Sequence, residues 1–262
     1  PTTAQAILME DWDAVLVLAN LIAEDIDAEP VAAIIRAWAL VAKGQGPAGL
    51  SHLIQSSNAN ISGNKSAPAI FTMQAARMAD YLGYSDEMLK LAEQLFKRND
   101  LSSHLVLQLA GLYARHNKNI KLERLIAQLP DGFDKLKVRK VLSNQTASPK
   151  IAHHIAAGII DASLITNRSK NDNMLKARLG LALYLNPQSE RARFLVAQTL
   201  SEINQTKSAK QQLANIDRTG VWSQPRLLLE INLDRSDNIG LAISHLESSL
   251  DKDQKNAFLH KE

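Results

Sequence analysis

The stretch that decides the fold is "LYLNPQSERARFLVAQTLSEINQTKSAKQQL", residues Leu183 to Leu213. Its apolar residues recur at the three- and four-residue spacing of an amphipathic helix. Pro187 closes one helical pattern, a second runs to Ile203, a polar turn follows, and a third begins. Because proline cannot continue a helix, this order predicts a helical hairpin that directly follows another helix.

The same periodicity extends over nearly the whole chain. Clear examples are "WDAVLVLANLIAED" at 12–25, "VAAIIRAWALVAK" at 31–43 and "IGLAISHLESSL" at 239–250. No convincing strand pair or hairpin turn intervenes, so we expect an all-α protein. The two longest breaks, 56–67 and 143–150, are the best linker candidates. They suggest an N-terminal half of degenerate helix pairs, 1–142, and a C-terminal half, 143–262, continuous with the first and cut short at its end.

Composition and charge limit the fold class and the functions that the chain can have. The chain has 262 residues, of which 45% are hydrophobic and only 5% aromatic, which favours helices over a β-sandwich. The net charge of +3 argues against a dedicated nucleic-acid binder. The absence of cysteine excludes disulfides and thiolate chemistry. No stretch approaches the ~20 apolar residues that a membrane span requires.

The spacing of small residues in the opening stretch resembles the tetratricopeptide repeat, a helix–turn–helix unit of about 34 residues. Ala197 stands where the family has a small residue in its first helix. Ala209 and Leu213 stand where it has an alanine and a bulky apolar residue in the second. The unit would begin at Glu190, and Arg193 replaces the usual tryptophan.

Three further units follow from this resemblance. One from Ala156 contains Ser163, Ala182 and Pro187, one from Glu29 contains Ala48 at the helix crossing, and one from Ser223 contains Ala242 and Leu246. Between 71 and 142 helix pairs persist while the consensus residues thin out. The resemblance implies a right-handed α-solenoid in which each hairpin is stabilised by its neighbours.

The overall arrangement also resembles exported tetratricopeptide proteins of proteobacterial type. That resemblance favours a periplasmic or exported location over a cytoplasmic one. It implies that the native chain begins before Pro1, with a signal sequence and at least one more repeat. The final "DKDQKNAFLHKE" resembles the start of another first helix, and we expect the exposed ends of the array to allow a homodimer.

In this family the first helices line a concave groove that binds a protein or peptide. Transferred to this chain, the groove positions are Arg115, His116, Asn167, Arg168, Arg191, Phe194, Gln198, Glu202, Gln224, Leu227, Ile231 and Arg235. The expected function is therefore a non-catalytic interaction scaffold. Two alternatives stay open: a structural component of a bacterial envelope complex, and a regulatory repeat module of a longer enzyme.

Three other motifs are explained more simply by local structure than by a catalytic or ligand-binding role. "GQGPAG" at 44–49 matches a dinucleotide fingerprint by letters, but a helical pattern precedes it, so we expect a turn with Pro47 opening a helix. His153 and His154 are adjacent and diverge by about 100° on a helix, so they cannot chelate a metal as a pair. "DKLKVRK" at 134–140 is expected to be a solvated helix face. We predict no enzymatic activity, cofactor or metal.

Overall fold

The structure is a computed structural model that describes residues 2–25, 28–58, 67–144, 146, 150–166 and 173–237, together with 240, 242–244, 246 and 247. All regular secondary structure among the described residues is helical and none of it is β-strand, as the periodicity predicts. The helices are α1 (Thr3–Leu8), α2 (Trp12–Ile22), α3 (Glu29–Ala42), α4 (Gly46–Asn58), α5 (Ala67–Tyr81), α6 (Ser85–Phe96), α7 (Ser103–Arg115), α8 (Asn119–Ala127), α9 (Lys135–Ser143), α10 (Ile151–Thr166), α11 (Asn173–Leu185), α12 (Glu190–Glu202), α13 (Thr206–Ala214) and α14 (Ser223–Asp237).

Five helix hairpins close through the same turn. In each turn one residue has a φ between 55° and 77°, the left-handed region that glycine and asparagine adopt most readily. The amide of the next residue donates to a carbonyl five residues earlier, at 2.8 to 2.9 Å. The left-handed residues are Glu10, Gly44, Gly83, Asn117 and Asn204. This recurring turn ends the first helix of each pair and joins it to the second, against which it packs.

Two pairs of these turns have the same spacing in the sequence. Thirty-four residues separate Glu10 from Gly44, and the same number separates Gly83 from Asn117. The second of these pairs lies in the region where the consensus residues are sparse. The other successive turns are spaced differently, since 39 residues separate Gly44 from Gly83 and 87 separate Asn117 from Asn204.

Three of the four expected repeat units begin at a helix start, whereas Ala156, the expected start of the fourth, lies within α10 (Ile151–Thr166). α3, α12 and α14 begin at Glu29, Glu190 and Ser223, the first residues of three of those units. α11 ends at Leu185, two residues before Pro187. Ala209 and Leu213 are fully buried in α13, as expected for the second helix of a hairpin.

One position of the expected register is wrong by a single residue. The register places Ala48 at the crossing of α3 and α4, but Ala48 is exposed, and Gly49 is buried there instead. A Cβ on Gly49 would lie 2.5 Å from the backbone oxygen of Ala37. The close approach of the two backbones therefore requires glycine at this position. Gly44 forms the turn and Pro47 lies in the first turn of α4, in agreement with the interpretation of "GQGPAG".

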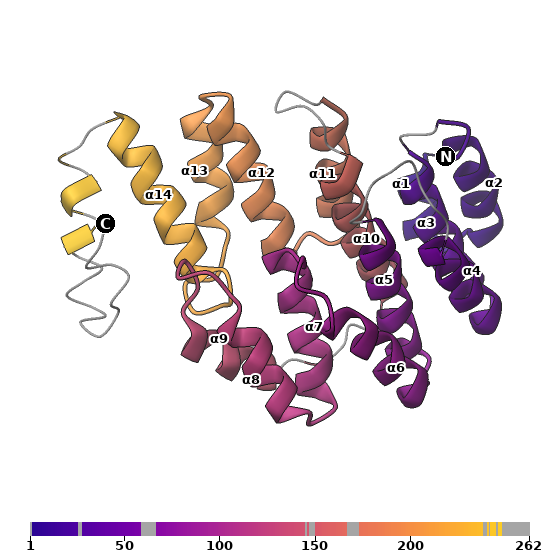
Figure 1. Cartoon of the computed structure of the whole chain (residues 1–262). Coiled ribbons are helices and arrows are strands. Elements are labelled where there is room, and N and C mark those ends of the chain that lie inside the picture. The colour runs from indigo at the N-terminus through magenta and orange to yellow at the C-terminus, as the bar shows by residue number, and fades with distance from the viewer. Residues whose placement is uncertain are drawn as a thin grey trace.

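The helices are arranged in two rows (Figure 1). The first row runs from α1 to α9, and the chain then returns so that α10 packs against α3 and α5 while α11 contacts α1. α12 to α14 continue the second row alongside α7 to α9. In a strictly linear array each hairpin contacts only its neighbours. Here contacts between residues far apart in sequence join the two halves as well.

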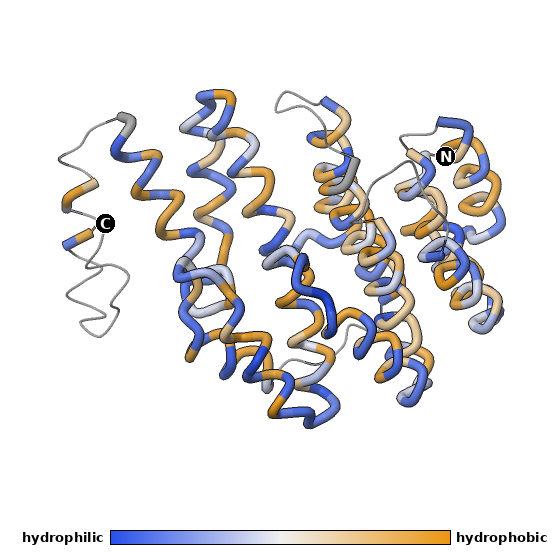
Figure 2. Tube along the Cα trace, in the orientation of Figure 1, coloured by the Kyte–Doolittle hydropathy of each residue, from blue (hydrophilic) through white to orange (hydrophobic). Residues whose placement is uncertain are grey.

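This return explains which helices are buried on all sides. Figure 2 shows hydrophobic and hydrophilic residues alternating along most helices, the pattern of helices with one buried face. In α3 and α5, by contrast, most residues are buried, among them the fully buried Trp38 and Phe71. Both helices lie between a hairpin partner and α10. Every helix among the described residues is too short or too polar to span a bilayer.

The two expected linkers lie largely outside the described residues, which omit 59–66, 145 and 147–149. The expected extra helix at 251–262 also lies outside them. The division at residue 142 remains a prediction.

Candidate functional site

The structure separates the predicted groove residues into several environments. Gln198, Glu202 and Arg235 are exposed, and Phe194 and Leu227 are half-buried. Gln224 and Ile231, with 5% exposure each, pack inside rather than face solvent. Asn167 and Arg168 lie outside the described residues.

Arg115 and His116 connect two helices of the first row. Arg115 Nη2 lies 2.6 Å from Asp80 Oδ2, and His116 Nε2 lies 2.6 Å from Asp80 Oδ1. Burial alone raises the pKa of Asp80, but the hydrogen bonds from His116 and Arg115 outweigh it and hold the pKa below its ordinary value. Asp80 belongs to α5, Arg115 is the last residue of α7 and His116 caps that helix, so these contacts fix α5 against α7.

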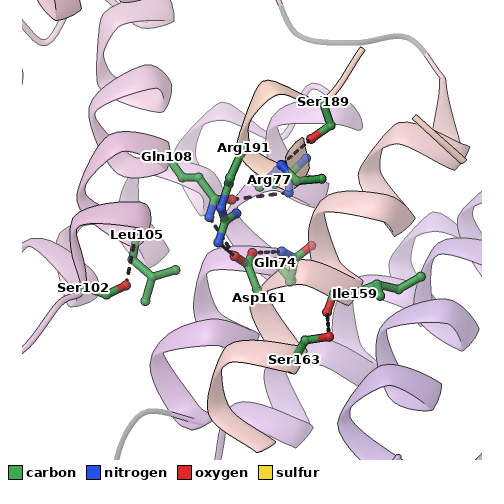
Figure 3. Close-up of polar contacts among 11 residues, drawn as sticks. Gln74, Arg77, Ser102, Leu105, Gln108, Ile159, Asp161, Ser163, Ser189 and Arg191 are labelled. Carbon is green, nitrogen blue, oxygen red and sulfur yellow. Dashed lines mark hydrogen bonds and ion pairs between the residues drawn. The ribbon is translucent and has the colours of Figure 1, made fainter. Parts of the chain in front are cut away.

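Arg191 belongs to a buried polar network at the junction of the two rows (Figure 3). Its Nη2 lies 2.5 Å from Asp161 Oδ1, and the Asp161 side chain is fully buried. Gln74 Nε2 donates to the other carboxylate oxygen at 2.6 Å, and Gln108 Nε2 donates to Oδ1 at 3.0 Å. These donors come from α5, α7 and α12 and converge on α10. Asp161 therefore links both rows through one carboxylate.

Two of the predicted groove residues, Phe194 and Gln198, line a pocket of about 320 Å³ between α7, α12 and α14. The pocket has an aromatic wall, and Trp222 lies at its centre. The ring of Trp222 lies 5.1 Å from that of Phe194, 5.3 Å from that of His104 and 5.7 Å from that of Phe133, between ring centroids. We call the pocket lined by these four rings and Gln198 the aromatic pocket.

Local structure explains why these side chains meet. Ser102 caps the first turn of α7 by accepting from the amide of Leu105, which positions His104 in that turn. Gln224 at the start of α14 donates to the carbonyl of Asp131 at 3.4 Å, and Lys137 Nζ donates to Ser223 Oγ at 3.2 Å. These two hydrogen bonds attach the segment around Phe133 to the first residues of α14, which directly follow Trp222.

Among the described residues that line the aromatic pocket, His104 has a buried polar atom without a hydrogen-bond partner, its Nδ1. Buried polar groups are normally paired, so such atoms are candidates for contacting a ligand. Burial, with a smaller effect of nearby Arg191, lowers the pKa of His104 to about 4. The imidazole is therefore neutral at pH 7, and its unpaired nitrogen can accept or donate one hydrogen bond.

Sequence patterns missed Trp222, Phe133 and His104. Trp222 and Phe133 lie outside the first helices from which the groove was predicted, in the segments that precede α14 and α9. The available signal was a large aromatic residue in a short polar segment immediately before a helix. Within the described part of the chain, no group of three or more His, Asp or Glu side chains is placed to hold a metal ion.

Comparison of the chain with models of protein families, with curated proteins and with solved structures found no match. The chemistry of the site therefore rests on its own residues and their geometry.

Proposed function

We propose that this protein is a non-catalytic helical-repeat scaffold of the tetratricopeptide class, with right-handed stacking of its hairpins. The 34-residue interval that occurs twice among the five turns supports the proposal, since about 34 residues is the length of that repeat. The coincidence of three helix starts with the expected units supports it as well. Its ligand is an extended protein segment that binds in the aromatic pocket.

The aromatic pocket is the observation that carries this function. Its volume of about 320 Å³ is at the lower end of the ~300–1,000 Å³ range of ligand sites, which suits one bulky apolar side chain. Aromatic residues in well-packed pockets supply most of the binding energy in many interfaces. Leu228 and Leu229 of α14 complete the apolar lining.

The unpaired nitrogen of His104 suits the main chain of such a segment. It can pair with either a peptide N–H or a carbonyl, according to its tautomer. At the opening, Gln198 and Asn232 are exposed side chains that can fix the register of the segment. Apolar burial then provides affinity, and the polar atoms provide orientation.

A selection from a peptide library tests the proposal and does not require an identified partner. Random peptides are selected on the wild-type protein and counter-selected on Phe194→Ala, which removes one wall of the pocket. We expect enriched peptides that share one bulky apolar residue. Their affinity should fall about tenfold or more in Phe194→Ala, equivalent to about 1.4 kcal/mol.

Two controls make the result specific. Gln211→Ala changes an exposed residue of α13 outside the pocket and should leave the affinity unchanged. Circular dichroism should show that Phe194→Ala retains its helical structure. Enriched peptides that bind the wild type and Phe194→Ala equally well would reject the aromatic pocket as the site.

A further inference from the structure

A second pocket, of about 260 Å³, lies at the junction of the two rows and is separate from the aromatic pocket. Helices α5, α7, α10 and α12 all contribute to it. Its charged and polar lining includes Arg77, Gln108, Arg115, His153, His154 and Arg191. Figure 3 shows the side chains of Arg77, Gln108 and Arg191 converging from three helices. We call this the arginine pocket.

The arginine pocket has an excess of positive charge. Two carboxylates stand against its three guanidinium groups: Asp80, which binds Arg115 and His116, and Asp161, which binds Arg191. Arginine remains charged in proteins, so one positive charge is left over.

The guanidinium group without a carboxylate partner is that of Arg77. Its guanidinium donates to Gln108 Oε1 at 3.4 Å and contacts His154 Nδ1 at 3.2 Å, an amide oxygen and an imidazole nitrogen. Within the described residues it makes no ion pair with a carboxylate. Burial, with smaller effects of Arg191 and Arg115, lowers the pKa of Arg77 to about 10 against the opposing effect of the two aspartates. A desolvated cation beside two others favours an added anion.

A second observation also points to an anionic ligand. Nε of Arg191 is buried and, among the described residues, has no hydrogen-bond partner, and the whole side chain is only 12% exposed. An unsatisfied N–H on a charged group is more costly than one on a neutral group. An oxyanion in the pocket would accept from it and balance the charge of Arg77 at the same time.

The shape of the donor set distinguishes between anions. A planar carboxylate matches the fork of one arginine. Here the arginines come from three helices: Arg77 from α5, Arg115 from α7 and Arg191 from α12. A tetrahedral group with three terminal oxygens can accept from more than one of them at once.

We propose that the arginine pocket binds a phosphate group, either inorganic phosphate or the phosphate of a small monoester. Arg77 and Arg191 bind its oxygens, and Arg115, held by Asp80, supplies positive potential from the third side. Because the bound group would contact both rows, binding would also strengthen their association.

Isothermal titration of the full chain with inorganic phosphate tests this proposal. Sodium chloride keeps the ionic strength constant, and acetate is titrated in parallel as a planar competitor. We expect saturable binding of one phosphate per chain, at least tenfold tighter than acetate. Arg77→Gln should weaken phosphate binding by tenfold or more. Arg139→Gln, a matched change at an exposed ion pair of α9, should have no effect.

Each outcome decides the question. If phosphate gives no more heat of binding than chloride does, the proposed site does not exist. The same follows if Arg77→Gln binds phosphate as tightly as the wild type does. If acetate binds as tightly as phosphate, the ligand is a carboxylate and the assignment is wrong. If Arg77→Gln fails to fold, the ring protons of His153 and His154 in the wild type replace it as a readout. They should shift saturably with phosphate in nuclear magnetic resonance spectra, and unchanged shifts would overturn the proposal.

Discussion

Trp38 of α3 stacks on His154 of α10, with ring centroids 4.4 Å apart and planes 15° from parallel. Tyr81 at the end of α5 packs edge-on against both rings, at 5.6 Å and 5.2 Å. These three aromatic rings come from the helices at which the two rows meet. The stacking shows that the two rows are closely packed where the chain returns. Small residues beside these rings allow the helices to approach each other.

Gly158 is one of those small residues, and we predict that Gly158→Ala destabilises the protein by about 1–3 kcal/mol. A Cβ at this position would lie 2.4 Å from Cγ2 of Ile34, a stiff β-branched side chain that is fully buried. Gly180→Ala is the matched control, because it is also helical and its Cβ would meet nothing within 4 Å. It should raise stability by up to about 1 kcal/mol through helix propensity. Urea unfolding measures both, and equal effects would show that α10 does not press on α3.

Asp161→Asn should destabilise the protein by about 3–5 kcal/mol, because it leaves the buried guanidinium of Arg191 without its counter-charge. The exposed pair Arg139–Glu123 provides the comparison, with side chains 48% and 43% exposed. Glu123→Gln should cost no more than about 1 kcal/mol. A double-mutant cycle of Asp161→Asn with Arg191→Gln should show strong coupling. Additive effects would contradict a direct ion pair.

His104 should make stability depend on pH. Its pKa is lowered by burial to about 4 in the folded state, below the ordinary 6.5. Between these values the unfolded chain binds more protons, so stability falls as pH decreases from about 6.5 to 4 and the loss is complete below 4. Nuclear magnetic resonance titration of the ring should give the low pKa directly. His104→Gln should reduce the loss of melting temperature over this window, whereas an unchanged slope would exclude His104 as its source.

The left-handed residues in the turns predict a further effect of mutation on stability, which comes from backbone conformation. Gly83 has a φ of 77° and open space around its Cα, so Gly83→Ala should cost about 1 kcal/mol from backbone strain alone. Gly83→Asn should cost less, because Asn117 and Asn204 adopt the same conformation in the equivalent turns. Thermal unfolding of the two variants compares them. Equal losses would mean that the side-chain environment, rather than φ, sets the cost.

The sequence predicted those features that neighbouring residues determine. Helix content, the end of α11 before Pro187 and the starts of α3, α12 and α14 depend on apolar spacing, caps and turn residues within a few positions of one another. One error of register, Ala48 for Gly49, arose because both residues are small and only the distance to Ala37 distinguishes them. The unit expected from Ala156 is also out of register, because α10 begins five residues earlier, at Ile151. Phe194 and Gln198 were expected to line a groove from their positions in the hairpin at 190–214, and the structure places both at the aromatic pocket.

The tertiary structure alone decided where the second row lies. Apolar residues on α10 indicate that it is buried, but they do not specify α3 and α5 as its partners, because hydrophobic burial is not directional. That choice depends on shape, such as the fit of Gly158 against Ile34, and on groups from distant segments meeting at Asp161. The aromatic pocket and the arginine pocket exist only because of this packing, so no local pattern could have revealed them.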